Sequence, residues 1–425
     1  TWQWRVETDP ELAASLGLLG KRRSGHALDP RSLESFDMRL KWMTAALDRL
    51  DKGLPPQDTH TLLSSEEDKL SYKLYKAQLN DYVTLTPQHK TYLCCVNRLE
   101  GPQTDLPLYA RYLLLDTKPQ RIFYRDFLRA IPQQLTEIIS LLTRGLEEGR
   151  TPPQVSLGGV VDQIHSMIQD QMQSFRTPIF GKDNAASCFN LPEEQDLIDE
   201  CTKLLDTTVP NAFSEFAKYL ETDYIPNLRT EISATDGYPD GAAYYAACLS
   251  FHTTTSMTAQ EIHELGLTEV DRIQSDMRKL AVEAGYSEDR LADYMEHLRT
   301  AKEYCPLSGE ALCAHYRDIA GRIAPALLKL FHVATLPRLP FSIVETPATS
   351  AHMAPAAYYL AGTGERPGTF YVNTSELPTR RTYECESLAL HEAIPGHHTQ
   401  AAIQGENASL PDFRRYCEDR RYFEA

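Results

Sequence analysis

Apolar residues recur at helical spacing through most of the first half of the chain. A capping-box sequence at 64–67 is followed by apolar residues three and four positions apart, namely Leu70, Leu74, Tyr75, Leu79 and Tyr82. This spacing puts them on one face of a helix. Similar patterns predict amphipathic helices over 132–146, 194–205 and 211–220, with a break at Pro210.

A second helical stripe begins after Thr258. Thr258 and Glu261 have the spacing of a capping box, and apolar residues continue from Ile262 to Leu280 at three- and four-residue intervals. The pair His263-Glu264 lies within this stripe, but a second histidine at the spacing of a zinc helix is lacking. We therefore interpret it as part of an ordinary helix surface.

The pattern changes between residues 341 and 374. Three short runs of β-branched and aromatic residues, at 341–344, 357–360 and 369–372, are bounded by Pro and Gly and predict a small sheet. A helix-like run over 382–390 follows. The expected fold class is mainly α, a large helical scaffold with a small β-sheet next to this last helix.

Turn residues at 236–241 and the change of pattern at 341 suggest where the chain divides. We expect a helical scaffold over 1–235, a helical middle region over 236–340, and a part over 341–425 that carries the sheet and the last helix.

Composition narrows the class of protein. The 425 residues are 42% hydrophobic and 24% charged, which is typical of a soluble globular chain. A formal net charge of -16 argues against nucleic acid as a partner, because phosphate binding relies on clustered Lys and Arg. No window approaches the roughly 20 apolar residues of a membrane span.

Weak signals favour a secreted or lumenal location. The sequence begins with Thr, and nine cysteines are too few and too scattered for a small disulfide scaffold. The triplets that begin at Asn373 and Asn407 match the N-glycosylation acceptor pattern.

The candidate chemistry lies in the octapeptide 391–398, His-Glu-Ala-Ile-Pro-Gly-His-His. Imidazoles beside a carboxylate suit a zinc-activated water. In a regular helix His391 and His398 would be separated by a rise of about 10.5 Å, too far to share an ion. Pro395 has no N–H to donate to the carbonyl of His391, and Gly396 can adopt backbone conformations that other residues avoid. A bulge here would bring a later histidine back to His391.

The octapeptide closely resembles the signature of the DUF885 family, whose members look like zincin metallopeptidases of the gluzincin type. Three further segments, 99–102, 261–267 and 366–374, resemble landmarks of the same family. The resemblance favours His391 and His397 as ligands of Zn2+ and Glu392 as the catalytic general base. His398 stays open as an alternative ligand, an outer donor, an oxyanion stabiliser or a residue with a packing role alone. The implied reaction is hydrolysis of an amide bond in a peptide or small amide substrate.

One departure from the family pattern concerns the third metal ligand. The pattern continues with a Glu-Gly-Trp segment that this sequence lacks, and Glu406, Glu418 and Glu424 lie in other contexts. A missing C-terminal segment or a second chain would complete the site. The alternative is a catalytically inactive relative that acts as a binding or structural component.

Candidate substrate contacts come from the sheet region. An extended peptide could add to a sheet edge by main-chain hydrogen bonds. Tyr358, Tyr359 and Tyr371 are candidate donors to the tetrahedral intermediate, although ordinary packing also explains them. Arg366 could pair with a substrate carboxylate or be solvated in its turn. Asn373 is a further candidate for substrate binding.

Overall fold

The computed structural model describes residues 2–16, 18, 25–53, 65–113, 115–180, 194–347, 351, 354–362 and 367–416. The chain divides into two compact units, Thr1–His252 and Thr253–Ala425. The three-part division expected at 235 and 340 stays a prediction.

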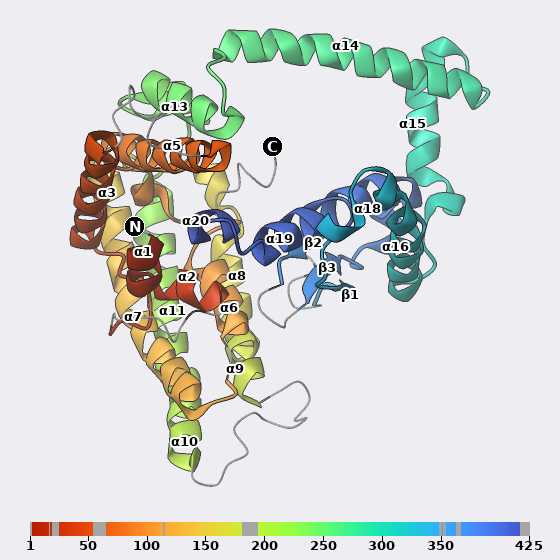
Figure 1. Ribbon diagram of the computed structural model, residues 1–425. Helices are drawn as coiled ribbons and strands as arrows, with labels where there is room; N and C mark the ends of the chain where they lie inside the picture. The colour runs from red at the N-terminus through yellow and green to blue at the C-terminus, as the bar shows by residue number, and fades with distance from the viewer. Residues whose placement is uncertain are drawn as a thin grey trace. The chain divides into compact units, whose positions relative to one another are not determined.

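The regular elements in the described part of the first unit are helices (Figure 1). Its α-helices are α1 (Trp2–Thr8), α2 (Pro10–Ser15), α3 (Leu33–Gly53), α5 (Glu66–His89), α6 (Pro102–Tyr112), α7 (Lys118–Glu147), α8 (Val160–Gln169), α9 (Gln173–Phe180), α10 (Gln195–Lys203), α11 (Val209–Tyr219), α12 (Ala234–Gly237) and α13 (Gly241–Thr253).

The longest of these helices is α7, which begins at Lys118. The predicted start of this helix at Pro132 is therefore wrong. Thr117 and Gln120 form a capping box around the first turn, and Pro119 occupies an early position where a missing N–H costs nothing. Pro132 lies inside the helix. The apolar face of α7 continues on both sides of this proline, and its burial outweighs the lost hydrogen bond.

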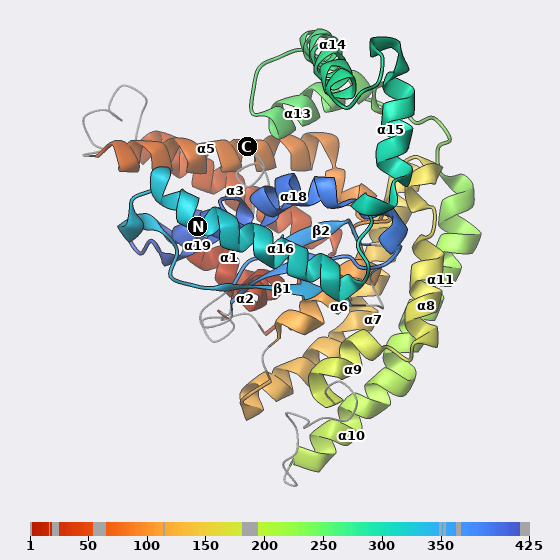
Figure 2. The same cartoon turned by 90° about the vertical axis from the view of Figure 1, so that its right-hand side faces the viewer.

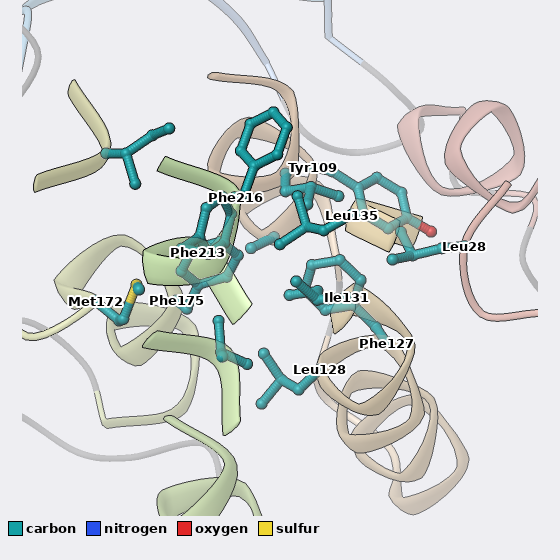
Figure 3. Close-up of a cluster of buried hydrophobic side chains, with 14 of the residues drawn as sticks. Leu28, Tyr109, Phe127, Leu128, Ile131, Leu135, Met172, Phe175, Phe213 and Phe216 are labelled. Atoms are coloured by element: carbon teal, nitrogen blue, oxygen red, sulfur yellow. The ribbon is translucent and has the colours of Figure 1, made fainter. Parts of the chain in front are cut away.

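The core of the first unit forms on that face (Figure 3). Phe127, Ile131 and Leu135 of α7 lie against Phe175 of α9 and Phe213 of α11. All five side chains are buried. Burying each large apolar side chain stabilises the fold by roughly 1.5–3 kcal/mol, so this cluster fixes the helices around α7.

The break predicted at Pro210 is also wrong. A turn of π-helix at Leu204–Thr208 connects α10 to α11 without a break, and a second π-helical turn at Leu220–Tyr224 extends α11. The wider turn directly before Pro210 accommodates a residue that cannot donate to the preceding turn.

The second unit contains the remaining described helices and the only described sheet. Its α-helices are α14 (Ala259–Glu283), α15 (Leu291–Thr300), α16 (Gly309–Ile323), α18 (Cys385–Glu392), α19 (His397–Glu406) and α20 (Asp412–Arg415). The capping box predicted at Thr258 and Glu261 is confirmed at the start of α14. His263 and Glu264 are exposed on this helix, in keeping with their interpretation as surface residues.

The three predicted strands are confirmed as β1 (Phe341–Glu345), β2 (Ala357–Leu360) and β3 (Gly368–Val372). They form a sheet of order β1-β3-β2, in which β1 is parallel and β2 antiparallel to β3. Helix α16 packs against β1, and α18 packs against β2 (Figure 2). Phe370 of β3, Tyr316 of α16 and Ala389 of α18 belong to their shared core.

The expected fold class is therefore confirmed. The protein is mainly helical and has a small three-stranded sheet beside the helix that carries His391. Within the described part of the chain, no helix is long and apolar enough to span a bilayer.

Candidate functional site

The octapeptide 391–398 forms the junction between two helices (Figure 1). Helix α18 ends at Glu392, four residues form a turn that includes a cis Ile394–Pro395 peptide bond, and α19 begins at His397. The backbone leaves the helical conformation at Ala393. The bulge expected near Pro395 is thus present, and it separates the two halves of the motif.

Gly396 makes this tight junction sterically feasible. A Cβ atom at this position would overlap the carbonyl oxygens of His391 and Leu390, which belong to the last turn of α18. These are main-chain atoms of a helix, which cannot rotate away as a flexible side chain can. The absence of a side chain at Gly396 therefore allows α19 to start directly against the end of α18.

The junction brings the imidazoles of His391 and His397 together. Their ring centres are 4.6 Å apart, with an angle of 76° between the ring planes. Two imidazoles bound to one tetrahedral zinc at about 2.0–2.1 Å have ring centres about 5 Å apart. His391 is exposed and His397 is half-buried, so the pair is open to solvent. This geometry suits two ligands of a single ion.

Glu392 lies beside the histidine pair in sequence, at the last position of α18. Its side chain is 7% exposed, whereas Glu386 on the same helix is exposed. Its burial and its place directly after His391 in the sequence make Glu392 a candidate general base.

His398 points elsewhere. Its Nδ1 lies 2.9 Å from the hydroxyl of Tyr359 on β2, and its ring centre lies 4.6 Å from that of Phe341 on β1. The side chain is 3% exposed. Burial lowers the pKa of its imidazole, and a hydrogen bond to the Leu339 backbone offsets part of this decrease. The described structure thus places His397 with His391, and His398 against the sheet.

Glu406 is one of the three downstream acids considered as a third ligand. Its carboxylate accepts hydrogen bonds from the backbone N–H groups of Arg338, at 2.8 and 3.1 Å, and of Leu339, at 2.9 Å. These contacts commit it to the segment that precedes β1. Glu418 and Glu424 lie outside the described residues.

The described residues contain no cluster of three or more His, Cys, Asp and Glu side chains that could hold a metal ion. The two imidazoles fit zinc as a pair, but a catalytic zinc site normally has three protein ligands. The donor set is therefore one ligand short within this part of the chain.

The proposed substrate contacts have different surroundings. Tyr371 pairs with Tyr358 across strands, and their rings stack at 4.9 Å. Phe370 is buried and packs with α16 and α18. Because the side chains of neighbouring strand residues point to opposite faces of a sheet, Tyr371 lies on the other face. Arg366 lies outside the described residues.

Asn373 is fully buried and its amide is used by the chain itself. Its Nδ2 donates to the carbonyls of Ala351, at 2.6 Å, and Ala354, at 2.9 Å. Its Oδ1 accepts from the backbone N–H and the hydroxyl of Ser375, at 3.0 and 2.6 Å. These bonds use its full hydrogen-bonding capacity, so the side chain holds Ala351 and Ala354, in the described part of the loop between β1 and β2, beside the end of β3.

Sequence reasoning missed the partners of His398 and the role of Glu406. The sequence suggests Tyr359 as an oxyanion donor, whereas in the structure its hydroxyl lies 2.9 Å from Nδ1 of His398. Burial raises the pKa of Tyr359 to about 12, so the phenol stays protonated as a donor at neutral pH. The sequence signal for this contact is Gly368, which begins β3, because a side chain at this position would overlap the phenol of Tyr359.

Comparisons with known proteins concern the family and the fold. A family model described as "Bacterial protein of unknown function (DUF885)" matches residues 10–424. The fold is similar to that of the "putative lipoprotein from Colwellia psychrerythraea", with a TM-score of 0.85 and 20% identity, covering 99% of this chain and 74% of that chain. It is also similar to a "putative lipoprotein of unknown function from Shewanella oneidensis", with a TM-score of 0.60 and 12% identity over 98% of this chain and 72% of that chain. No curated protein matches this chain.

Proposed function

The chain belongs to the DUF885 family, and from the geometry of its histidine pair we propose that it is a zinc-dependent hydrolase of peptide or small amide bonds. The observation that supports this proposal is the 4.6 Å separation between the ring centres of His391 and His397, together with the burial of Glu392, which follows His391 in the sequence. Neither the family description nor the related structures supply an activity, so the proposal rests on these residues.

In this proposal, His391 and His397 are neutral imidazole ligands. Zinc would supply a bound water whose pKa falls to about 7 and would polarise the scissile carbonyl. Glu392 accepts the proton of the attacking water and delivers it to the leaving amine nitrogen. The third ligand is a carboxylate outside the described residues or on a second chain.

The small sheet is the proposed place for the substrate backbone. An extended peptide can add to an edge strand by main-chain hydrogen bonds, and β1 and β2 form the two edges of the sheet. The protein is proposed to act outside the cytoplasm. Support for this location comes from two solved structures of similar fold, each titled a "putative lipoprotein".

A catalytically inactive relative that serves as a binding or structural component is the second candidate. The observation in its favour is the two-residue donor set in the described part of the chain.

Turnover of a peptide library with bound zinc separates the two candidates. Glu392→Gln should retain the metal and lose about 10²–10⁴-fold in rate, because the general base is removed and the ligands stay. Glu386→Gln is the matched control, since this residue of the same helix is exposed and its carboxylate lies 3.6 Å from the guanidinium of Arg322 in a solvent-exposed ion pair. Full turnover by Glu392→Gln would refute the mechanism, and zinc binding without turnover in the wild type would favour the inactive relative.

A further inference from the structure

His398 is held in a socket between the sheet and the segment that precedes it. The hydroxyl of Tyr359 meets Nδ1 at 2.9 Å, so the opposite ring nitrogen is left to donate to the Leu339 backbone. The ring of Phe341 lies against the imidazole, at 4.6 Å between ring centres. With 3% of its surface exposed, His398 is enclosed by these three residues.

The socket depends on a glycine in the central strand. Gly368 of β3 pairs with Phe341 of β1, and a Cβ atom at Gly368 would overlap the phenol ring and hydroxyl of Tyr359. The missing side chain therefore lets Tyr359 lie across β3 and reach His398. Any larger residue at 368 would push the phenol out of the socket.

The other end of α19 is attached to the same segment. Glu406 is the last residue of α19 and accepts from the backbone N–H groups of Arg338 and Leu339. His398 lies in the first turn of α19 and contacts Leu339 as well. Residues 398 and 406 are about 12 Å apart along the helix axis, so two contacts with the same segment restrict both the position and the rotation of the helix.

Rotation of α19 decides where His397 points. Successive residues of an α-helix are about 100° apart around the axis, so a helix that keeps His398 in its socket directs His397 about 100° to one side of that socket. The observed partner in that direction is His391, with ring centres 4.6 Å apart. We propose that His398 is a positioning residue, which together with Tyr359 and Gly368 sets the His391–His397 pair. This inference rests on the zinc site of the proposed function.

The test compares variants of the socket that leave both proposed ligands intact. Gly368→Ala, Tyr359→Phe and His398→Leu should each weaken zinc binding about 10–100-fold, the range for residues that orient metal ligands. His398→Gln should recover part of the loss, since its amide can still donate to the Leu339 carbonyl. Gly405→Ala is the control on the same helix, because no described heavy atom lies within 4 Å of the added Cβ.

Two readouts on the full chain keep the inference and the proposed function separate. Zinc affinity is measured by competition with a chromophoric chelator. The ring-to-ring nuclear Overhauser effect between His391 and His397, in protein with labelled histidine, reports their contact without any metal. The inference predicts that Gly368→Ala and His398→Leu lose this contact and that Gly405→Ala keeps it.

A folded Gly368→Ala variant that keeps both the ring contact and wild-type zinc affinity would overturn the inference. Loss of the contact in the socket variants, in a wild type that binds no zinc, would support the positioning role and refute the zinc site. If His398→Leu fails to fold, Gly368→Ala and Tyr359→Phe decide the outcome.

Discussion

Replacement of Gly396 by Ala should damage the histidine pair with little other effect on the fold. The new Cβ would overlap the carbonyl oxygens of His391 and Leu390. Main-chain atoms would have to move by more than about 1 Å to restore van der Waals separations near 3.5 Å. Zinc sites tolerate ligand displacements of only about 0.2 Å, so the relaxed junction cannot hold the ion in its original geometry.

The size of the effect follows from the cost of that overlap. Overpacking in a tight site costs about 1–3 kcal/mol. The metal-free junction can relax by moving α19 away from α18, and zinc binding must then force the overlap back. At 1.4 kcal/mol per factor of ten, the affinity for zinc should fall about 5- to 140-fold.

The assay is zinc competition with a chromophoric chelator, accompanied by urea unfolding of each variant. Gly405→Ala, in the same helix but with open space around its added Cβ among the described residues, should bind zinc like the wild type. A Gly396→Ala variant that is folded and binds zinc with unchanged affinity would refute the steric reasoning.

Two further predictions concern stability and are measured by urea unfolding. Asn373→Ala should lower the unfolding free energy of the second unit by about 2–4 kcal/mol, because two donated and two accepted hydrogen bonds are lost from a buried site. A change below about 0.5 kcal/mol would contradict the role of Asn373 in holding the loop. Phe213→Ala should cost about 3–5 kcal/mol, since its ring is fully buried in the core around α7. The exposed neighbour Ser214→Ala should stay within about 0.5 kcal/mol, and similar losses in both variants would argue against that core.

Local patterns in the sequence predicted the elements that depend on local physics. The three strands were evident from β-branched and aromatic runs between turn residues, and the start of α14 from its capping box. The bulge after Glu392 followed from Pro395 and Gly396, because both act on the backbone within one helical turn.

Other features depended on contacts between distant residues and were missed. Pro132 and Pro210 looked like helix ends, but burial against neighbouring helices and a wider π-turn override the local preference. The choice between His397 and His398 was open in the sequence, because the socket of His398 is built from residues 339, 341, 359 and 368. Glu406 could not be recognised as an acceptor for the Arg338 and Leu339 backbone, since nothing near it in sequence reveals these partners.

Metal content of the purified protein tests the central claim most directly. Elemental mass spectrometry of the wild type and of His391→Ala and His397→Ala, with His263→Ala as the exposed-histidine control, measures whether the pair holds an ion. We expect about one zinc per chain in the wild type and in His263→Ala, and loss of the zinc from the other two variants. Wild-type protein without bound metal after exposure to zinc, or zinc retained by both His391→Ala and His397→Ala, would contradict it.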